Sequence, residues 1–102
     1  MNFYSTPITT DEQYIRVRNV PVAYSYYHIK VLFSKYELKL SDIKIINDQN
    51  GQRTGEIVLR LHTYKDAADL LSQDGSIQGL HSFLDIKKID EYTFASASDS
   101  YM

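Results

Sequence analysis

The chain has 102 residues, which is enough for one domain with a single hydrophobic core. A formal net charge of −2 excludes nucleic-acid binding that depends on a strongly basic overall field, so any such binding must use a local patch. Cysteine is absent, which excludes disulfides, thiolate nucleophiles and cysteine metal sites. No apolar run approaches the ~20 residues that span a bilayer, and no signal peptide is recognisable.

The first predicted strand follows a polar segment, residues 1–12, which we expect to be a flexible lead-in. From Tyr14 to Val20, apolar and polar residues alternate, as is typical of a half-buried strand. Ile15 and Val17 are expected to face the core. Pro21 removes a backbone donor and ends the strand.

Residues 26–36 are predicted to form an amphipathic helix, with Ser25 as its N-cap. Residues 42–47 are predicted to form the second strand. Asn50 and Gly51 then mark a hairpin connection. The expected core positions of the helix recur at helical spacing and are Ile29, Leu32, Phe33 and Tyr36.

The third strand is predicted over residues 56–61, with alternate residues facing the core. Thr63 is expected to cap a second helix over residues 64–73. A loop with two glycines, residues 74–82, leads to a last strand over residues 83–89. Residues 91–102 are polar and serine-rich and are typical of the start of a linker. The domain therefore covers residues 13–90.

The element order is βαββαβ, which predicts an α+β, ferredoxin-like sandwich. Its four-stranded antiparallel sheet has the first and third strands at the centre and both helices on one face. The other face of the sheet is predicted to be open, and we expect function to reside there.

Two strands resemble the sequence motifs of the RNA-recognition-motif family, over about residues 13–90. Residues 15–20 (IRVRNV) are similar to its hexameric motif and residues 54–61 (TGEIVLRL) to its octameric motif. In that family, aromatic side chains on these strands stack on RNA bases. The resemblance places those positions at Arg16, Glu56 and Val58, none of which is aromatic. We expect Arg16 to lie across from Glu56 and to pair with it.

The strings IRVRNVP and RTGE are also similar to the quasi-recognition motifs of the F/H type heterogeneous nuclear ribonucleoproteins. Those domains lack sheet aromatics and hold G-rich single strands with loop residues. The resemblance implies RNA contacts at Arg18 and Phe83. Val22 occupies the position of a third, aromatic contact, which Tyr24 nearby would replace.

The predicted open face has more positive than negative side chains, and two interpretations of it remain open. It is either a patch that attracts phosphates or a solvated face with weak cross-strand ion pairs. The cations are Arg16, Arg18, Lys44, Arg60 and Lys87, and the anions are Glu56 and Asp85.

An apolar group on the same face, Ile46 and Val58 with Phe83 at its edge, is typical of a protein interface. The alternative is that the C-terminal segment folds back and covers the group with Tyr92 or Phe94. We favour a protein partner. Exposed residues Tyr27 and Val31 of the first helix are either a dimerisation stripe or isolated surface residues.

The sequence shows no nucleophile–base pair, and the histidines, His28, His62 and His81, lack metal-ligand spacing. We therefore expect no enzyme activity, cofactor, metal, membrane contact or small-molecule substrate.

The favoured function is that of an adaptor or dimerisation module in an RNA-processing or ribonucleoprotein complex, in the nucleus or cytoplasm. Its partner would be another protein, a second domain of this type or another copy of the chain. The alternative is single-stranded RNA binding through loop and strand-end residues. The candidate RNA contacts are Arg16, Arg18, Tyr24, Arg60, Phe83 and Lys87. The candidate protein contacts are Tyr27, Val31, Ile46, Glu56, Val58 and Phe83.

Overall fold

The computed structural model describes residues 12–74 and 84–99. Most of the predicted lead-in, most of the predicted loop at 74–82, and Phe83 lie outside these ranges. The strands are β1 (Gln13–Arg18), β2 (Ile43–Asn47), β3 (Arg53–Leu61) and β4 (Asp85–Ile89). The α-helices are α1 (Tyr26–Leu32), α2 (Tyr64–Leu71) and α3 (Glu91–Ser96), and short 3-10 turns cover Ser34–Tyr36 and Leu40–Asp42.

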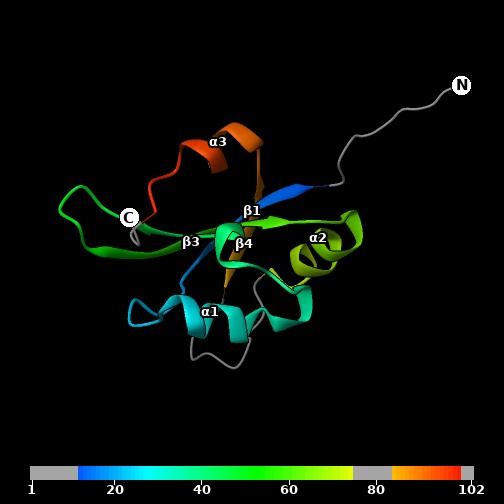
Figure 1. The fold of residues 1–102 in the computed structure, drawn as a ribbon, viewed down its shortest axis with the longest axis horizontal. Helices are drawn as coiled ribbons and strands as arrows, with labels where there is room; N and C mark the ends of the chain where they lie inside the picture. The colour runs from blue at the N-terminus through cyan, green and yellow to red at the C-terminus, as the bar shows by residue number, and fades with distance from the viewer. Residues whose placement is uncertain (1–11, 75–83, 100–102) are drawn as a thin grey trace, which may run out of the picture.

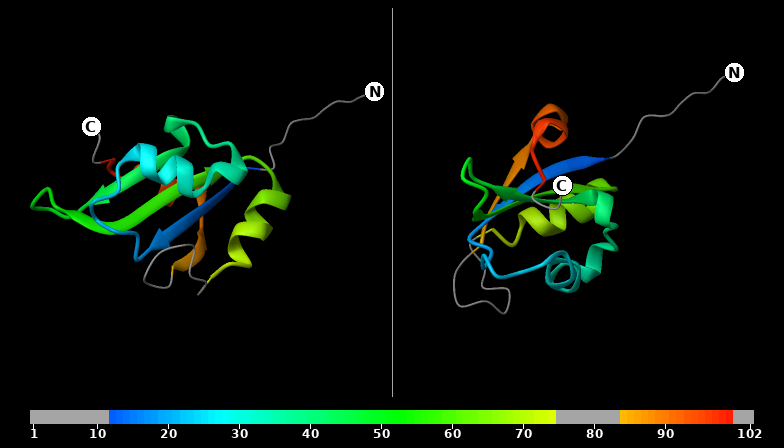
Figure 2. Two further views of the ribbon diagram at one scale, coloured as in Figure 1. Left: turned by 90° about the horizontal axis from the view of Figure 1, so that it is seen from below. Right: turned by 60° about the vertical axis from the view of Figure 1, so that its left-hand side comes forward.

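The strands form one antiparallel sheet in the order β2-β3-β1-β4, so the predicted central position of the first and third strands is confirmed. Helices α1 and α2 cover one face of the sheet, and α3 lies on the opposite face (Figures 1 and 2). The main core lies between the sheet and the first two helices. It includes Ile15, Val17, Ile29, Leu59 and Leu70.

Both predicted helix caps are present. The Ser25 side chain accepts a hydrogen bond from the His28 amide, and the Thr63 side chain accepts one from the Asp66 amide. The first helix is shorter than predicted because the chain leaves α-helical geometry at Phe33 (φ −109°, ψ 29°). A 3-10 turn follows and keeps Tyr36 in the core.

The C-terminal segment differs from the predicted polar linker. Residues 91–96 form α3, and the carboxylate of its N-cap residue, Asp90, accepts a 2.7 Å hydrogen bond from the Thr93 amide. The sheet face that was predicted to be open is therefore partly covered. Within the described ranges, no helix is long and apolar enough to span a bilayer.

The register of the sheet changes one predicted pair. Arg16 lies directly opposite Val58 on β3 and Lys87 on β4. Glu56 pairs instead with Arg18, whose Nε lies 3.1 Å from the Glu56 carboxylate. The predicted Arg16–Glu56 pair is wrong because the two strands are offset by two residues relative to that expectation.

A buried carboxylate, Asp42, joins the start of β2 to the end of β3. Its oxygens accept hydrogen bonds from Arg60 Nε (2.9 Å), His62 Nε2 (2.8 Å) and the Lys39 amide (2.9 Å). Burial raises the pKa of Asp42, but these three donors together outweigh burial and hold the pKa below its ordinary value. The network also fixes the Arg60 side chain in place.

This network predicts a pH-dependent contribution to stability. Asp42→Asn should lower the free energy of unfolding at neutral pH by about 2–3 kcal/mol, because Arg60 loses its charged partner. The folded-state pKa is depressed, so the contribution is present above about pH 4 and is lost as the pH falls further. Urea unfolding of both proteins should show the difference shrinking below about pH 4. A difference that stays constant down to the most acid pH would contradict the account.

Gly55 allows β3 to approach the chain that follows β1. Its φ is +83°, and a Cβ there would lie 3.0 Å from the Val20 carbonyl oxygen. Gly51, in the hairpin turn, has a similar φ of +80° but open space around it. An alanine at Gly51 would therefore lose stability through the left-handed backbone alone, whereas an alanine at Gly55 would also meet close packing.

We expect Gly51→Ala to lower stability by about 1 kcal/mol through backbone strain alone. Gly55→Ala should cost about 1–2 kcal/mol more, because the added methyl group also displaces Val20. Chemical denaturation of the two variants measures the difference, and equal losses would show that the close approach is unimportant.

Candidate nucleic-acid interface

The outer face of the sheet is organised around one side chain of α3, Phe94, which is only 5% exposed. Its ring centroid lies 5.2 Å from that of Tyr14 on β1. Two cations approach the same ring, with Lys44 Nζ at 4.7 Å and the Arg60 guanidinium carbon at 5.4 Å. Burying a phenylalanine contributes about 1.5–3 kcal/mol, so this contact favours the docking of α3 on the sheet.

Lys44, predicted to be one of the outward cations of this face, holds the C-terminal end of α3. Its Nζ donates hydrogen bonds to the backbone oxygens of Phe94 (2.7 Å), Ala95 (3.2 Å) and Ala97 (3.2 Å). Carbonyl groups at a helix C-terminus lack intrahelical partners and carry partial negative charge. Lys44 both donates hydrogen bonds to these carbonyl groups and offsets their partial negative charge.

The chain after α3 continues to the edge of β2. The Asp99 carboxylate accepts a 3.1 Å hydrogen bond from the Ile45 amide and another from the Tyr26 hydroxyl. Asp99 also forms an isolated antiparallel bridge with Ile46. The chain after α3 thus places Asp99 along the β2 edge of the sheet.

This arrangement corrects the predicted exposed apolar patch. Val58 is only 2% exposed, and Ile46 is half-buried. The structure shows the alternative in which the C-terminal segment covers the patch, and Phe94 is the covering residue. Tyr92, the other candidate, points to solvent with 78% of its surface exposed.

The β1–β4 half of the face keeps two adjacent cations. Arg16 and Lys87 are direct cross-strand neighbours. Arg16 Nε is buried and donates to no acceptor among the described residues. Lys87 Nζ lies 2.8 Å from Asp74 and 3.8 Å from Asp85. The hydrogen bond to Asp74 raises the pKa of Lys87, whereas the nearby Arg16 charge acts in the opposite direction.

Two further candidate RNA contacts, Arg18 and Tyr24, lie on β1 and in the loop between β1 and α1. Arg18, at the end of β1, is half-exposed and paired with Glu56. Tyr24 is half-buried, with its ring 5.2 Å from that of His28, and its carbonyl accepts a 2.7 Å hydrogen bond from Arg53. Sequence reasoning missed Arg53, although its position just before the octameric motif could have indicated a cation beside this loop.

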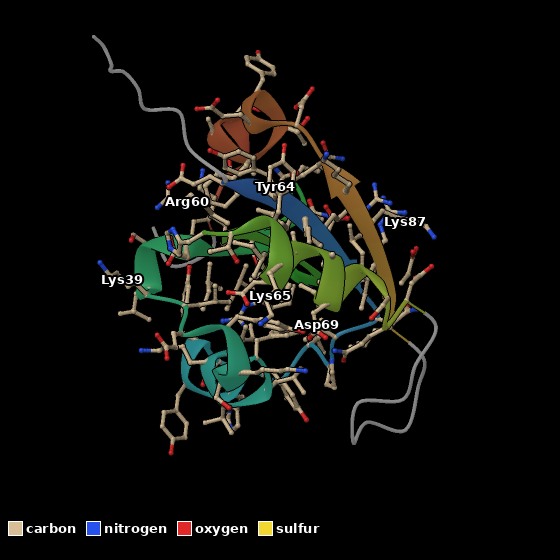
Figure 3. All side chains as sticks on the ribbon, turned by 90° about the vertical axis from the view of Figure 1, so that its right-hand side faces the viewer. Lys39, Arg60, Tyr64, Lys65, Asp69 and Lys87 are labelled. Carbon is tan, nitrogen blue, oxygen red and sulfur yellow. The ribbon has the colours of Figure 1, made fainter. Side chains whose placement is uncertain are left out.

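Figure 3 shows Arg60 and Lys87 on opposite flanks of the sheet, with Lys65 and Asp69 on α2 in the other layer. Arg60 is engaged by Asp42 and by the Phe94 ring. The predicted RNA contacts that lie within the described residues are therefore not brought together as one patch.

The candidate contacts on α1 are exposed as predicted, Tyr27 by 72% and Val31 by 56%. They lie away from the core residue Ile29 and on the opposite layer from α3. Among the described residues, no cluster of histidine and acidic side chains could hold a metal ion.

The sequence matches no protein-family model, and no curated protein matches it. Solved structures do resemble the fold. The Glorund qRRM2 domain superposes with a TM-score of 0.74 at 20% identity, over 85% of this chain and 99% of that chain. Human G-rich RNA sequence binding factor 1 gives 0.69 at 17% identity, over 80% and 84%. A Sxl-lethal protein/RNA complex gives 0.68 at 18% identity, over 85% and 55%.

These similarities agree with the sheet order and with the helices on one face. The chain therefore has the fold of the RNA-recognition motif, as the sequence motifs predicted.

Proposed function

We propose that the chain binds single-stranded RNA through the cations of β1 and β4, namely Arg16, Arg18 and Lys87. The observation that supports this most is that Arg16, directly opposite Lys87, has a buried Nε with no acceptor among the residues that the structure describes. Like charges in directly opposed cross-strand positions destabilise a sheet. A phosphate between the two side chains would offset the repulsion between Arg16 and Lys87, and its oxygen would accept a hydrogen bond from Arg16 Nε.

The solved structures give a reason to choose RNA among anionic ligands. One of the similar proteins is named for binding G-rich RNA, and another was solved in a complex with RNA. The local placement of the cations also explains how a chain with a net charge of −2 could bind a polyanion. Arg16, Arg18 and Lys87 together form a cationic strip. Arg18 lies at the end of β1, next to the loop that contains Tyr24.

The adaptor function was inferred from the missing stacking aromatics, the acidic net charge and the apolar group of Ile46, Val58 and Phe83. Of that group, Val58 is buried and Ile46 is half-buried in this structure, and Phe83 lies outside the described residues. Tyr27 and Val31 on α1 are exposed and still favour a protein partner. Protein binding through α1 is therefore the second candidate function. Light scattering and NMR line widths, measured with Tyr27→Ser as a control, would detect self-association through this helix.

Arg16→Ala and Arg18→Ala should each weaken binding to a pool of short random-sequence RNAs by about three- to tenfold at low salt. Each variant should also reduce the slope of log affinity against log salt by about 0.7, because one phosphate contact is lost from a single strand. Fluorescence anisotropy at several salt concentrations measures both quantities.

Lys65→Ala is the matched control, because Lys65 is an exposed cation on α2, in the other layer of the domain (Figure 3). It removes the same charge without touching the proposed strip. Equal losses for Lys65→Ala and Arg16→Ala would indicate non-specific attraction and would count against the strip as the site.

A further inference from the structure

We propose that the β4 edge of the sheet is a self-association site, at which β4 of a second copy of this chain pairs antiparallel with β4 once Asp74 leaves the edge. β4 stands last in the strand order, with β1 as its neighbour on one side, and Lys87 marks this flank in Figure 3. The Ile86 amide donates a 2.7 Å hydrogen bond to the Asp74 carboxylate, so it points away from β1. This edge is separate from the exposed pair on α1, and its pairing does not require RNA.

Asp74 occupies the edge through two interactions. Its carboxylate accepts the hydrogen bond from the Ile86 amide and a second one, of 2.8 Å, from Lys87 Nζ. These two donors hold the pKa of Asp74 below its ordinary value, so the carboxylate is charged at neutral pH. Unpaired backbone groups on an edge strand attract a further strand, and covering them prevents that pairing. Here a single exposed side chain covers the Ile86 amide, which makes the cover displaceable.

The charges of β4 select one symmetric register for two copies. Asp85 and Lys87 share one face of the strand, where they lie opposite Arg18 and Arg16 of β1. In an antiparallel pair centred on Ile86, the two Ile86 residues exchange both backbone hydrogen bonds, and Asp85 of each copy lies opposite Lys87 of the other.

The neighbouring registers lack this complementarity. A pair centred one residue earlier places Asp85 opposite Asp85, and a pair centred one residue later places Lys87 opposite Lys87. Like charges in directly opposed positions destabilise a pair of strands, whereas opposite charges stabilise it. The register centred on Ile86 is therefore the one that we expect.

In that register, the second copy replaces both interactions of Asp74. The Ile86 carbonyl of the other copy accepts the hydrogen bond from the Ile86 amide, and the Asp85 carboxylate of the other copy pairs with Lys87. Neither the amide nor the ammonium group loses an acceptor, which matters because an unpaired backbone donor is costly. The interface has two-fold symmetry, so each of these interactions forms twice.

Removing the Asp74 carboxylate should strengthen self-association. We expect Asp74→Ala to lower the dissociation constant of the dimer by about tenfold, because a charge-assisted hydrogen bond no longer competes with strand pairing. Asp74→Asn should have a smaller effect, since its amide oxygen still accepts from the Ile86 amide. Sedimentation equilibrium over a concentration series measures the constants, and circular dichroism verifies that each variant is folded.

Charge reversals in the Asp74→Ala background test the register. Asp85→Lys and Lys87→Glu should each weaken self-association by about tenfold, because each places like charges opposite one another in both halves of the interface. An equimolar mixture of the two variants should form a heterodimer, since the lysines of one chain then meet the acidic residues of the other.

Two matched controls separate this edge from other modes of association. Lys88→Glu changes the same charge on the next residue, which faces the opposite side of the strand, and it should not substitute for Lys87→Glu in the mixture. Tyr27→Ser alters only the exposed face of α1 and should leave the association of Asp74→Ala unchanged.

An Asp74→Ala chain that stays monomeric at its highest soluble concentration would overturn the inference. Association that Tyr27→Ser removes, or that the charge reversals leave unchanged, would also overturn it. If Asp74→Ala fails to fold, the mixture of Asp85→Lys and Lys87→Glu chains with Asp74 intact decides the question, because absence of a heterodimer would contradict the register. These experiments contain no RNA, so their failure leaves the proposed function to its own test with Arg16→Ala.

Discussion

The Phe94 ring brings together groups from three strands, because it packs on Tyr14 of β1 and receives Lys44 of β2 and Arg60 of β3. This contact determines which parts of the outer face of the sheet are accessible. Phe94 is the one buried residue of this six-residue helix among the described residues, so without this contact the helix would lack an anchor. The domain thus has a large core beneath α1 and α2, and a small second cluster on the opposite face that one side chain maintains.

The two halves of that face have different properties as a result. On the β2–β3 half, the cations are already engaged, Lys44 by carbonyl groups of α3 and Arg60 by Asp42. On the β1–β4 half, Arg18 is paired with Glu56 and Lys87 with Asp74. Arg16 faces Lys87 and keeps a buried Nε donor that has no acceptor among the described residues. The sequence alone does not show which of these cations have partners on the sheet face. Their different partners are what direct the proposed RNA strand toward β1 and β4.

Local sequence signals predicted the strands, the two N-caps and the sheet order, because alternation and capping depend on neighbouring residues. Which residues pair across strands was harder to predict from the sequence than the strands themselves. Arg18 and Arg16 both fit opposite Glu56 in the sequence pattern, and only the strand register selects Arg18. The sequence favoured a polar linker after residue 90, and docking of the C-terminal segment was only the alternative. The serine-rich composition drew attention away from Asp90, which caps α3 through the Thr93 amide. The burial of Phe94 depends on β1, β2 and β3, which are distant from it in sequence.

The most direct test of this account is the nuclear Overhauser effect between the aromatic rings of Tyr14 and Phe94 in the free chain. Docking of α3 on the sheet predicts clear cross-peaks between the two rings, which lie 5.2 Å apart, and ring-current shifts for both. Phe94 signals at random-coil positions without contacts to Tyr14 would contradict the account, because the sheet face would then be open in the free chain.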